Sequence, residues 1–247
     1  MTGAAPTERS GIPPRPSDRS SSATPRTSVR RFPERGTSDP SQIREILQAG
    51  LVCHVGFVEA DLPVVIPTTY GLLGDSLVIH GIAASRLLAR LRRRVEVCVN
   101  VTLFDGLVLA ASAFEHSMNY RSVVLFGRAR WLRDEREKLA ALRAMSEHIL
   151  PGRWADTRPP SQAELKQTHV LAIPLDEASG KIRVGPPSPE EPGWDTWVGV
   201  MPAELRWGPP QSHGGGEQEL PDYIATRAGT VVGGVRTRNA KSREEFK

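Results

Sequence analysis

The segment from Ser117 to Trp131, SMNYRSVVLFGRARW, constrains the fold more than any other part of the chain. It begins with a polar cluster, NYRS (119–122), and continues into an apolar run, VVLF (123–126), of residues that favour strands. Successive side chains of a strand point to opposite faces, so Arg121 shares a face with Val123. The segment therefore predicts a β-strand that carries polar groups at its beginning, at the mouth of a barrel.

Other strand-like runs flank this segment at short intervals. Most connections between them are as short as hairpins, which favours antiparallel pairing over a parallel sheet with helical crossovers. Pro63 and Pro67 indicate an edge strand or a bulge, and Asp105–Gly106 predicts a tight turn. The runs cover residues 51–58, 62–70, 76–80, 95–104, 107–111, 117–132, 169–175, 181–184 and 194–201. This pattern predicts a mostly β fold, an antiparallel barrel with α-helical decorations, and argues against a Rossmann fold.

Four segments show the pattern of an α-helix. One begins at Pro40 with Asp39 as its cap and ends before Gly50. Ser161 and Glu164 form a capping-box pattern at the start of a short helix. Two more helices are expected at 83–94 and 134–149, where apolar residues recur at helical spacing. The residues expected to face the core in these two helices are Leu87, Leu88, Leu91, Leu139, Leu142, Met145 and Ile149.

Both ends of the chain differ in composition from its middle. Residues 1–39 are rich in Ser, Pro, Thr and Arg, and residues 211–247 contain a glycine run followed by a polar, basic stretch. Neither segment can bury enough apolar surface to offset the entropy of ordering, so we expect two disordered tails. They also account for the modest hydrophobic content of 39%. One folded domain is therefore predicted over residues 40–210.

Composition also excludes several classes of protein. The net charge is +4, but much of the arginine lies in the tails without interleaved aromatic residues, so we do not expect nucleic-acid binding. The sequence contains neither an apolar run of membrane-spanning length nor an N-terminal signal segment. Cys53 and Cys98 both lie in apolar runs and are interpreted as buried hydrophobic residues, which fits a cytoplasmic protein.

Residues 80–86, HGIAASR, offer an anion-binding site. A strand ends at His80, Gly81 turns the chain, and a helix begins near Ser85. Backbone N–H groups at a helix start attract anions, Ser85 adds a hydroxyl donor, and Arg86 adds a guanidinium that fits a phosphate. The alternative is an ordinary capped helix with an exposed arginine.

The cluster at 119–122 offers a second place for a ligand. Arg121 at the barrel rim can contact a phosphate, while Asn119 and Ser122 can hydrogen-bond a planar ligand rich in acceptors. The alternative is that Arg121 pairs with an acidic neighbour such as Glu115. The six histidines lack metal-ligand spacing, and no activated serine or cysteine nucleophile is evident. A phosphate pocket without an acid–base set suggests that a bound cofactor carries the reactivity.

Several motifs together resemble a known family. The motifs are VCHVGF (52–57), VIPTTY (65–70), LVIHG (77–81) followed by Ser85–Arg86, DGLVLA (105–110), SMNYRSVV (117–124), KIRVGPP (181–187) and WVGV (197–200). They resemble the flavin-binding split barrels of the pyridoxamine 5′-phosphate oxidase-like superfamily, in the branch related to nitroimidazole reductases. The resemblance covers residues 31–210.

This resemblance implies a six-stranded antiparallel Greek-key split barrel that forms a homodimer with FMN in the groove between the subunits. It implies an FMN-dependent oxidoreductase that transfers a hydride or electrons to a small planar substrate. His80 and Tyr120 are the expected catalytic residues, orienting or protonating the acceptor. The residues expected to hold the cofactor are Pro67, Thr68, Thr69, Tyr70, His80, Gly81, Ser85, Arg86, Asn119, Tyr120, Arg121, Ser122, Lys181, Arg183 and Trp197.

Two positions depart from the pattern expected for the branch. Ala111 stands where the branch suggests an arginine, and Glu115 stands where it suggests a histidine. These changes point to weaker binding, to a different ligand in a specialised biosynthetic enzyme, or to simple surface substitutions. A non-catalytic binding protein for flavin, deazaflavin or haem is the second hypothesis, and His54, His80 or His116 would then be the axial ligand of a haem.

Overall fold

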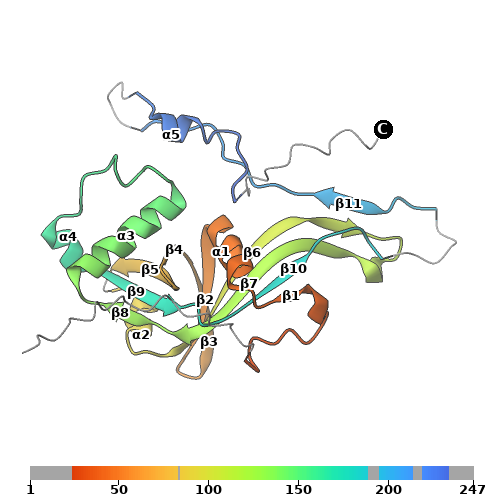
Figure 1. The fold of residues 1–247 in the computed structure, drawn as a ribbon, viewed down its shortest axis with the longest axis horizontal. Coiled ribbons are helices and arrows are strands. Elements are labelled where there is room, and N and C mark those ends of the chain that lie inside the picture. Colours follow the sequence, from red (N-terminus) through yellow and green to blue (C-terminus); the bar gives the residue numbers. More distant parts are fainter. Residues whose placement is uncertain (1–23, 83, 189–194, 214–218, 234–247) are drawn as a thin grey trace, which may run out of the picture.

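The computed structural model describes residues 24–82, 84–188, 195–213 and 219–233 and consists mainly of antiparallel β-structure (Figure 1). The strands are β1 (Gly36–Thr37), β2 (Val52–Glu59), β3 (Leu62–Thr69), β4 (Gly71–Leu73), β5 (Ser76–Ile82), β6 (Glu96–Leu109), β7 (Ser117–Arg128), β8 (Arg130–Leu132), β9 (Thr168–Pro174), β10 (Glu177–Arg183) and β11 (Gly199–Pro202). They form a seven-stranded and a four-stranded sheet. The predicted fold class is confirmed, with strands divided between two sheets.

The order of the strands shows how the barrel is split. The larger sheet runs β1-β10-β7-β6-β2-β3, with β11 added to β6, and the smaller runs β4-β5-β9-β8. Every pair is antiparallel. β3 is an edge strand of its sheet, as its prolines predicted. β7 and β8 are separated only by the buried Ala129, where the chain passes from one sheet to the other.

The helices are α1 (Pro40–Ala49), α2 (Arg86–Leu91), α3 (Glu135–Ile149), α4 (Gln162–Gln167) and α5 (Asp222–Ala225), with 3₁₀ turns at Pro33–Arg35 and Ala113–Glu115. The side chain of Asp39 caps α1, and Ser161 and Glu164 form the predicted capping box of α4. No helix in the described ranges is long and apolar enough to cross a membrane.

The core fills the space between the inner faces of the two sheets and α1. Its largest fully buried side chains include Tyr70, Leu47 and Leu171. The Tyr70 hydroxyl donates a hydrogen bond to the Leu47 carbonyl oxygen at 2.6 Å, which ties the end of β3 to α1. Cys53 belongs to this core, and burial raises its pKa to about 12. Cys98 is half-buried, and both cysteines are free thiols.

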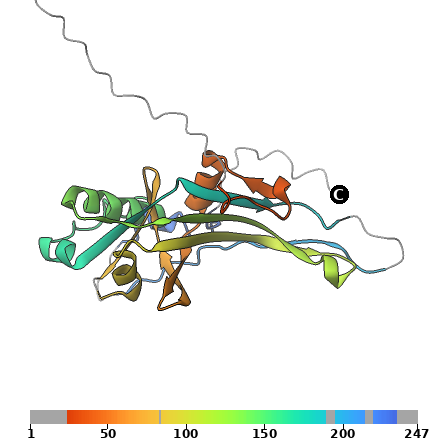
Figure 2. The ribbon, with the colours of Figure 1, turned by 90° about the horizontal axis from the view of Figure 1, so that it is seen from below.

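Strands β6 and β7 extend beyond the barrel as a long arm, to which β11 adds a third strand (Figures 1 and 2). The predicted turn at Asp105–Gly106 is wrong, because β6 continues through it with a register shift between Phe104 and Gly106. Such a bulge lets one strand bend without ending, and Gly106 accommodates it with a φ of 149°. The predicted tight turn is therefore a bend within the arm.

Two helices differ in detail from the sequence prediction. α2 is shorter than predicted, although Leu87, Leu88 and Leu91 are buried as expected. The fully buried residues of α3 are Lys138, Ala141 and Met145, so its inward face is rotated from the predicted leucine stripe. The rotation follows from the close approach of α3 to β4, where the backbone of Met145 lies against Gly71.

Parts of both predicted tails are ordered against the barrel. Arg26 forms ion pairs with Glu96 and Glu177. Residues 36–37 pair with β10 as the short strand β1. At the other end, an isolated antiparallel bridge pairs Val231 with Arg206, which follows β11 in the chain. The rest of the predicted tails, residues 1–23, 214–218 and 234–247, lies outside the described residues.

Candidate functional site

The predicted site residues occupy several separate places on the described chain. Several of these residues line concave regions of the described chain. The rim hollow comprises two adjoining depressions of about 450 and 550 Å³ that share Arg35, at the end of β10. The helix cavity, about 470 Å³, lies between β5, α3 and α4. The gap cavity, about 790 Å³, lies beside β6. All four volumes fall within the range of ligand pockets.

The rim hollow gathers three of the predicted cofactor residues, Tyr120, Lys181 and Arg183. Tyr120 on β7 lies directly opposite Arg183 on β10, and Lys181 follows two residues before it on the same face. Arg31, Phe32 and Arg35, from the segment before β1, form the facing wall. The hollow therefore combines two sheet strands with a part of the chain that composition alone assigned to a tail.

Arg183 is the most unusual charge of the rim hollow. Its side chain belongs to a residue only 9% exposed, and its Nη1 donates to Oδ1 of Asn119 at 2.5 Å. No carboxylate pairs with it in the described part of the chain. Burial, and then the nearby charge of Arg35, lower its pKa. A buried cation without a counter-ion costs free energy, so the site favours an anion that supplies the missing charge.

Two contacts fix the wall opposite Arg183. Lys181 Nζ donates to the backbone oxygen of Arg31 at 2.9 Å, and the Arg35 guanidinium lies 4.1 Å from the centre of the Phe32 ring. Phe32 itself has a φ of 55°, in the left-handed region that bulky residues rarely adopt. This strained residue is held in place by its neighbours at the edge of a hollow, a setting that is typical of ligand sites.

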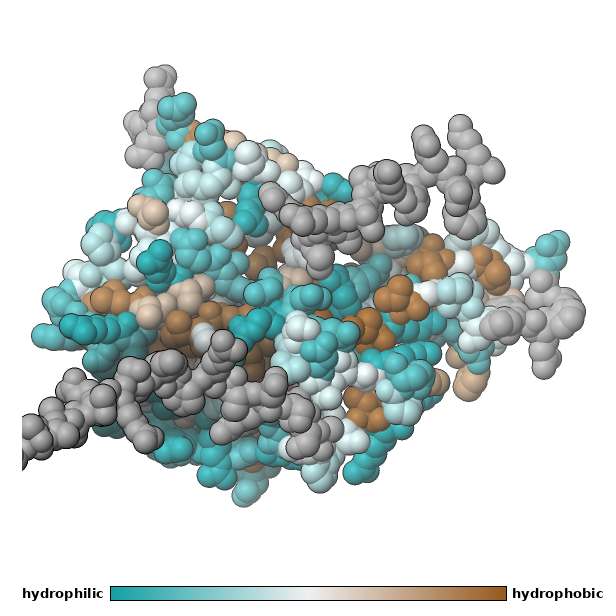
Figure 3. All heavy atoms as spheres, viewed as in Figure 1, coloured by the Kyte–Doolittle hydropathy of each residue, from teal (hydrophilic) through white to brown (hydrophobic). Residues whose placement is uncertain are grey.

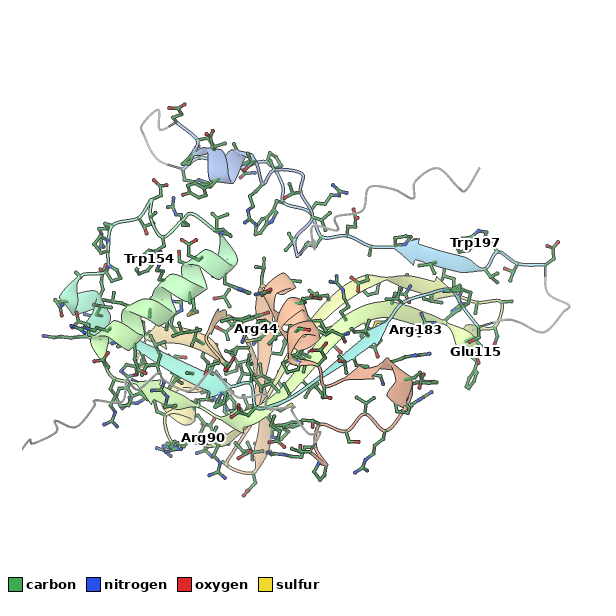
Figure 4. All side chains as sticks on the ribbon, viewed as in Figure 1. Arg44, Arg90, Glu115, Trp154, Arg183 and Trp197 are labelled. Atoms are coloured by element: carbon green, nitrogen blue, oxygen red, sulfur yellow. The ribbon has the colours of Figure 1, made fainter. Side chains whose placement is uncertain are left out.

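The gap cavity contains Arg121, but here the guanidinium is neutralised. Its Nη2 and Nε contact the two oxygens of Asp105 at 2.7 and 3.0 Å, a bidentate ion pair that raises the pKa of Arg121. Arg121 therefore pairs with an acidic neighbour, the alternative to a phosphate contact, and that neighbour is Asp105 rather than Glu115. Glu115 is exposed at the far end of the arm (Figure 4).

The gap cavity exists because one edge of β6, the edge away from β7, has no paired strand between the parts that β2 and β11 cover. β2 pairs with β6 only up to Asn100, and β11 pairs only from Gly106 onward. The segments 202–205 and 231–233 lie across the opening between them. His54 lines this cavity and forms no hydrogen bond within the described residues.

His80 lines the helix cavity rather than the rim hollow. Its walls combine apolar side chains of α3, including Leu142, Met145 and Ile149, and Trp154 from the following segment (Figure 4) with polar residues. The polar residues are Ser146, Thr157, Arg158, Glu164 and Thr168. His80 keeps a solvent-exposed edge, yet desolvation lowers its pKa, so the ring is neutral at physiological pH. It has no hydrogen-bond partner in the described ranges, which leaves a ring nitrogen available to a ligand.

Ser85 and Arg86 lie at the start of α2, away from the three concave regions. Ser85 precedes the first helical residue without capping it through its side chain. Arg86 is largely exposed and forms an ion pair with Glu59, with Nη2 and Oε2 2.6 Å apart. Within one described chain, Arg86 and Arg121 thus do not face a common hollow. The shared phosphate role predicted for them stays a prediction.

The remaining predicted residues are dispersed. Pro67, Thr68 and Thr69 lie on the edge strand β3, whereas the Tyr70 side chain is fully buried and available to a ligand only through its backbone. Gly81 is half-buried on β5, and Ser122 donates to the Lys181 carbonyl oxygen at 3.4 Å. Trp197 is 66% exposed on the arm (Figure 4).

The other histidines are engaged in the fold or lie outside the cavities. His148 contacts the Gly50 carbonyl oxygen through Nε2 at 2.8 Å, and His116 contacts that of Ala110. His169 is buried against Trp131, with Nδ1 unpaired. No cluster of three or more metal-ligating side chains occurs among the residues that the structure describes. Sequence reasoning missed Arg31, Phe32, Arg35 and Asp105, because no local motif links them to the strands they contact.

Comparison with known proteins gives consistent results. A family model described as pyridoxamine 5′-phosphate oxidase matches residues 39–182. The flavocytochrome Anf3 from Azotobacter vinelandii is 34% identical, with a TM-score of 0.77 over 83% of this chain and 98% of its own. An FAD and heme binding protein from Mycobacterium smegmatis is 30% identical, with a TM-score of 0.74 over 79% and 98%. A putative 5-nitroimidazole antibiotic resistance protein from Bacteroides thetaiotaomicron is 25% identical, with a TM-score of 0.51 over 60% and 86%. The search of curated proteins found no match.

Proposed function

The chain belongs to the pyridoxamine 5′-phosphate oxidase family, and we propose that within it the protein is a flavin-dependent oxidoreductase whose cofactor phosphate binds in the rim hollow. Arg183 is the observation that carries this proposal. It is a buried guanidinium without a carboxylate partner in the described chain, next to the cations of Arg35 and Lys181. A phosphate satisfies such a group through charge-assisted, bidentate hydrogen bonds.

The residues of the rim hollow have distinct roles in this proposal. Arg183, Lys181 and Arg35 bind phosphate oxygens, while Asn119 holds the Arg183 guanidinium in position. Tyr120, opposite Arg183, lies beside the cofactor and is available to hydrogen-bond it or the substrate. The bound flavin supplies hydride and electron transfer, and the protein supplies binding and orientation. The substrate class predicted from the sequence, a small planar molecule, is retained.

A homodimer is part of the proposal, because Tyr120 and His80 line different concave regions of one chain. Exposed apolar side chains cover the faces that a second subunit would bury. On β2 and β3 they include Val52, Val58 and Val65, and Figure 3 shows further hydrophobic residues on the arm. Patches of this kind mark protein–protein contacts. Light scattering that finds only monomers with bound flavin would remove this part of the proposal.

A cytoplasmic location, predicted from the unpaired cysteines, is also part of the proposed function.

Flavin binding is tested by titration of the purified protein with FMN and FAD, followed by flavin fluorescence and calorimetry. We expect saturable binding of one flavin per subunit and loss of affinity in Arg183→Gln. Arg128→Gln is the matched control, because Arg128 is exposed and paired with Glu96. A protein that binds neither FMN nor FAD would contradict the proposal, and binding of a deazaflavin alone would favour the rival hypothesis of a deazaflavin-binding protein.

A second cofactor, haem, is favoured by a separate observation. The names of the two relatives that are at least 30% identical describe a flavocytochrome and an FAD and heme binding protein. The helix cavity of this chain fits such a group, because it combines apolar walls with the neutral, unpaired imidazole of His80. His80 would serve as the axial ligand, and the iron would supply one-electron chemistry next to the flavin.

Reconstitution with haemin tests this second cofactor. We expect one haem per subunit and a Soret spectrum typical of histidine ligation. His80→Ala should abolish that spectrum, whereas His54→Ala and His116→Ala should retain it. Loss of the Soret band in His54→Ala instead would move the haem to the gap cavity, and no haem binding at all would leave the flavin as the sole cofactor.

A further inference from the structure

The end of α2 carries an arginine patch, which consists of Arg92, Arg93 and Arg94 after α2 and of Arg133 after β8. All four residues are exposed, and none forms an ion pair within the part of the chain that the structure describes. Three other arginines of these elements and their neighbours are paired, Arg86 with Glu59, Arg128 with Glu96 and Arg130 with Glu137. The arginine patch therefore presents positive charge that the described chain does not neutralise.

Trp131 orders two members of the arginine patch. α2 and β8 lie side by side (Figure 1), and the guanidinium groups of Arg92 and Arg133 lie 4.1 and 4.7 Å from the centre of the Trp131 ring. Both distances are within the range of cation–π attraction. Because these contacts restrict the guanidinium groups before a partner binds, less side-chain entropy is lost on association.

A buried imidazole lies next to the Trp131 ring. The ring of His169, on β9, is 5.1 Å from that of Trp131, and its Nδ1 has no hydrogen-bond partner in the described chain. Desolvation, and then the charges of Arg92 and Lys138, lower the pKa of His169. Lys138 is itself buried and donates to the Leu165 carbonyl oxygen. The positive potential of the arginine patch thus extends to the side chains beneath it.

The arginine patch suits a protein surface better than a small anion or a nucleic acid. Its arginines line neither the rim hollow, the helix cavity nor the gap cavity, whereas small ligands bind in concave sites. Single-stranded nucleic acid stacks its bases on free aromatic rings, but the Trp131 ring is half-buried and already lies against two guanidinium groups. An acidic protein needs neither feature, because complementary charge attracts and orients it.

The arginine patch also adjoins the helix cavity through β9. His169 is in register with Gly81 of β5, the residue that follows His80. Thr168, the residue before His169, lines the helix cavity together with His80. A protein docked on the arginine patch is therefore close to the proposed cofactor site in that cavity, as electron transfer between two proteins requires.

From these observations we infer that the arginine patch docks an acidic protein that carries single electrons and serves as the electron donor of this oxidoreductase. The inference rests on the proposed function, because it names the class of donor for that reaction. Each docked carrier is oxidised by one electron, and two such transfers, with protons from solvent, reduce the flavin by two electrons. Encounters of this kind bury little surface and depend on charge.

The test measures how fast an acidic carrier reduces the flavin of the full-length, flavin-loaded protein. The probe is a reduced plant-type [2Fe–2S] ferredoxin, and stopped-flow absorbance follows the flavin. We expect the second-order rate constant to fall at least about tenfold as the ionic strength rises from about 0.01 to about 0.5 M. The double variant Arg92→Gln/Arg133→Gln should lower the low-salt rate constant about tenfold and flatten its salt dependence.

Two further variants sharpen the test. Arg44→Gln/Arg206→Gln is the matched control, because it also removes two positive charges, from arginines that pair with Asp75 and Glu204. Its rate constant should stay within about twofold of the wild type. Trp131→Leu keeps the charges but removes the cation–π contacts, and should lower the rate constant by about two- to fivefold. Thermal denaturation identifies any loss that comes from unfolding.

Flavin binding and reduction by dithionite should be the same in all variants, which separates docking from the flavin site. A rate constant that does not depend on salt, or that Arg92→Gln/Arg133→Gln leaves unchanged, would overturn the docking inference and leave the proposed function intact. The same would follow if the double variant lost affinity only for a single-stranded DNA oligonucleotide. If the protein binds no flavin, the proposed function fails, and calorimetry of ferredoxin binding at low salt still tests docking: loss of binding in the double variant supports it, and no binding to the wild type overturns it.

Discussion

The gap cavity and the rim hollow each contain an arginine, and the two arginines differ in whether the chain supplies a counter-ion. In the gap cavity, Arg121 makes a bidentate ion pair with Asp105, and both side chains are a little more than one quarter exposed. In the rim hollow, Arg183 is more deeply buried and contacts only the amide of Asn119 among the described side chains. The two arginines are neighbours across strands, since Arg121 is in register with Ile182.

The presence or absence of a carboxylate partner distinguishes the two arginines. Arg121 is paired and stabilises the fold, whereas Arg183 is the one that we propose binds a ligand. Arg121 has its counter-ion in the chain, and the pairing raises its pKa. Arg183 has none there, and burial lowers its pKa. An arginine stays charged at physiological pH in either case, and in the proposed function a bound anion supplies the charge that the described chain does not give Arg183. The proposal thus places binding at the rim hollow and a stabilising role at the Arg121–Asp105 pair.

The largest expected effect comes from removing the unpaired charge. Arg183→Gln should weaken flavin binding by about 10- to 100-fold, because a hydrogen bond to a charged group contributes roughly 1.5–3 kcal/mol. Its stability without ligand should be unchanged or higher, since a desolvated charge is removed. Isothermal titration and urea unfolding measure the two quantities. A variant that binds flavin like the wild type would contradict the proposed role of Arg183.

Removing the paired carboxylate of Asp105 should lower stability and leave flavin affinity nearly unchanged, the opposite of the effects expected at Arg183. Asp105→Asn leaves Arg121 half-buried without a counter-ion, and we expect the free energy of unfolding to fall by about 2 kcal/mol. Flavin affinity should stay within about twofold of the wild type. Urea denaturation tests the first expectation and titration the second. Unchanged stability together with lost flavin binding would assign the flavin to the gap cavity instead.

A carboxylate placed beside Arg183 should give the rim hollow an arginine with its own counter-ion, as the gap cavity already has in Arg121. Asn119→Asp supplies the missing counter-ion at the atom that Arg183 Nη1 already contacts. We expect flavin affinity to fall by about tenfold through competition and repulsion. The new ion pair should stabilise the fold, and the loss of the hydrogen bond from Asn119 Nδ2 to the Gly185 carbonyl oxygen should offset part of that gain. Asn119→Ser, which removes the amide without adding charge, is the control and should lose less affinity. Equal losses in both variants would show that the amide contact matters more than charge.

The smallest expected effect is on the pH dependence of stability. It comes from His148, which, like Arg183, is a basic side chain whose pKa burial lowers. Burial lowers the pKa of His148, so below about pH 6.5 the unfolded chain binds more protons than the folded one. Stability should therefore fall, by about 1 kcal/mol or less, as the pH drops from 7 to 5. His148→Gln should flatten this dependence, and substitution of the exposed His213 should not. A slope unaffected by His148→Gln would contradict the assignment.

Features fixed by local sequence were predictable. The cap at Asp39, the capping box at Ser161 and the edge position of β3 all follow from residues within one element, and the structure confirms them. The anion site beside α2 was inferred from local pattern as well, but Arg86 pairs with Glu59, 27 residues away. A local motif shows where a charge is and does not show which distant group neutralises it.

Features fixed by contacts between distant residues were not predictable. The bulge at Gly106 continues β6 where a turn was expected, and it places Asp105 rather than Glu115 beside Arg121. The order of residues 24–37 depends on contacts such as Arg26 with Glu177, 151 residues apart. Composition gives no sign of such a contact, so half of the rim hollow could not be recognised from sequence alone.

A crystal structure of the protein with bound FAD tests the central claim most directly. We predict that phosphate oxygens lie within hydrogen-bond distance of Arg183 and Arg35, and that Arg121 remains paired with Asp105. A pyrophosphate bound at Ser85 and Arg86, or in the gap cavity, with no anion at Arg183, would contradict it.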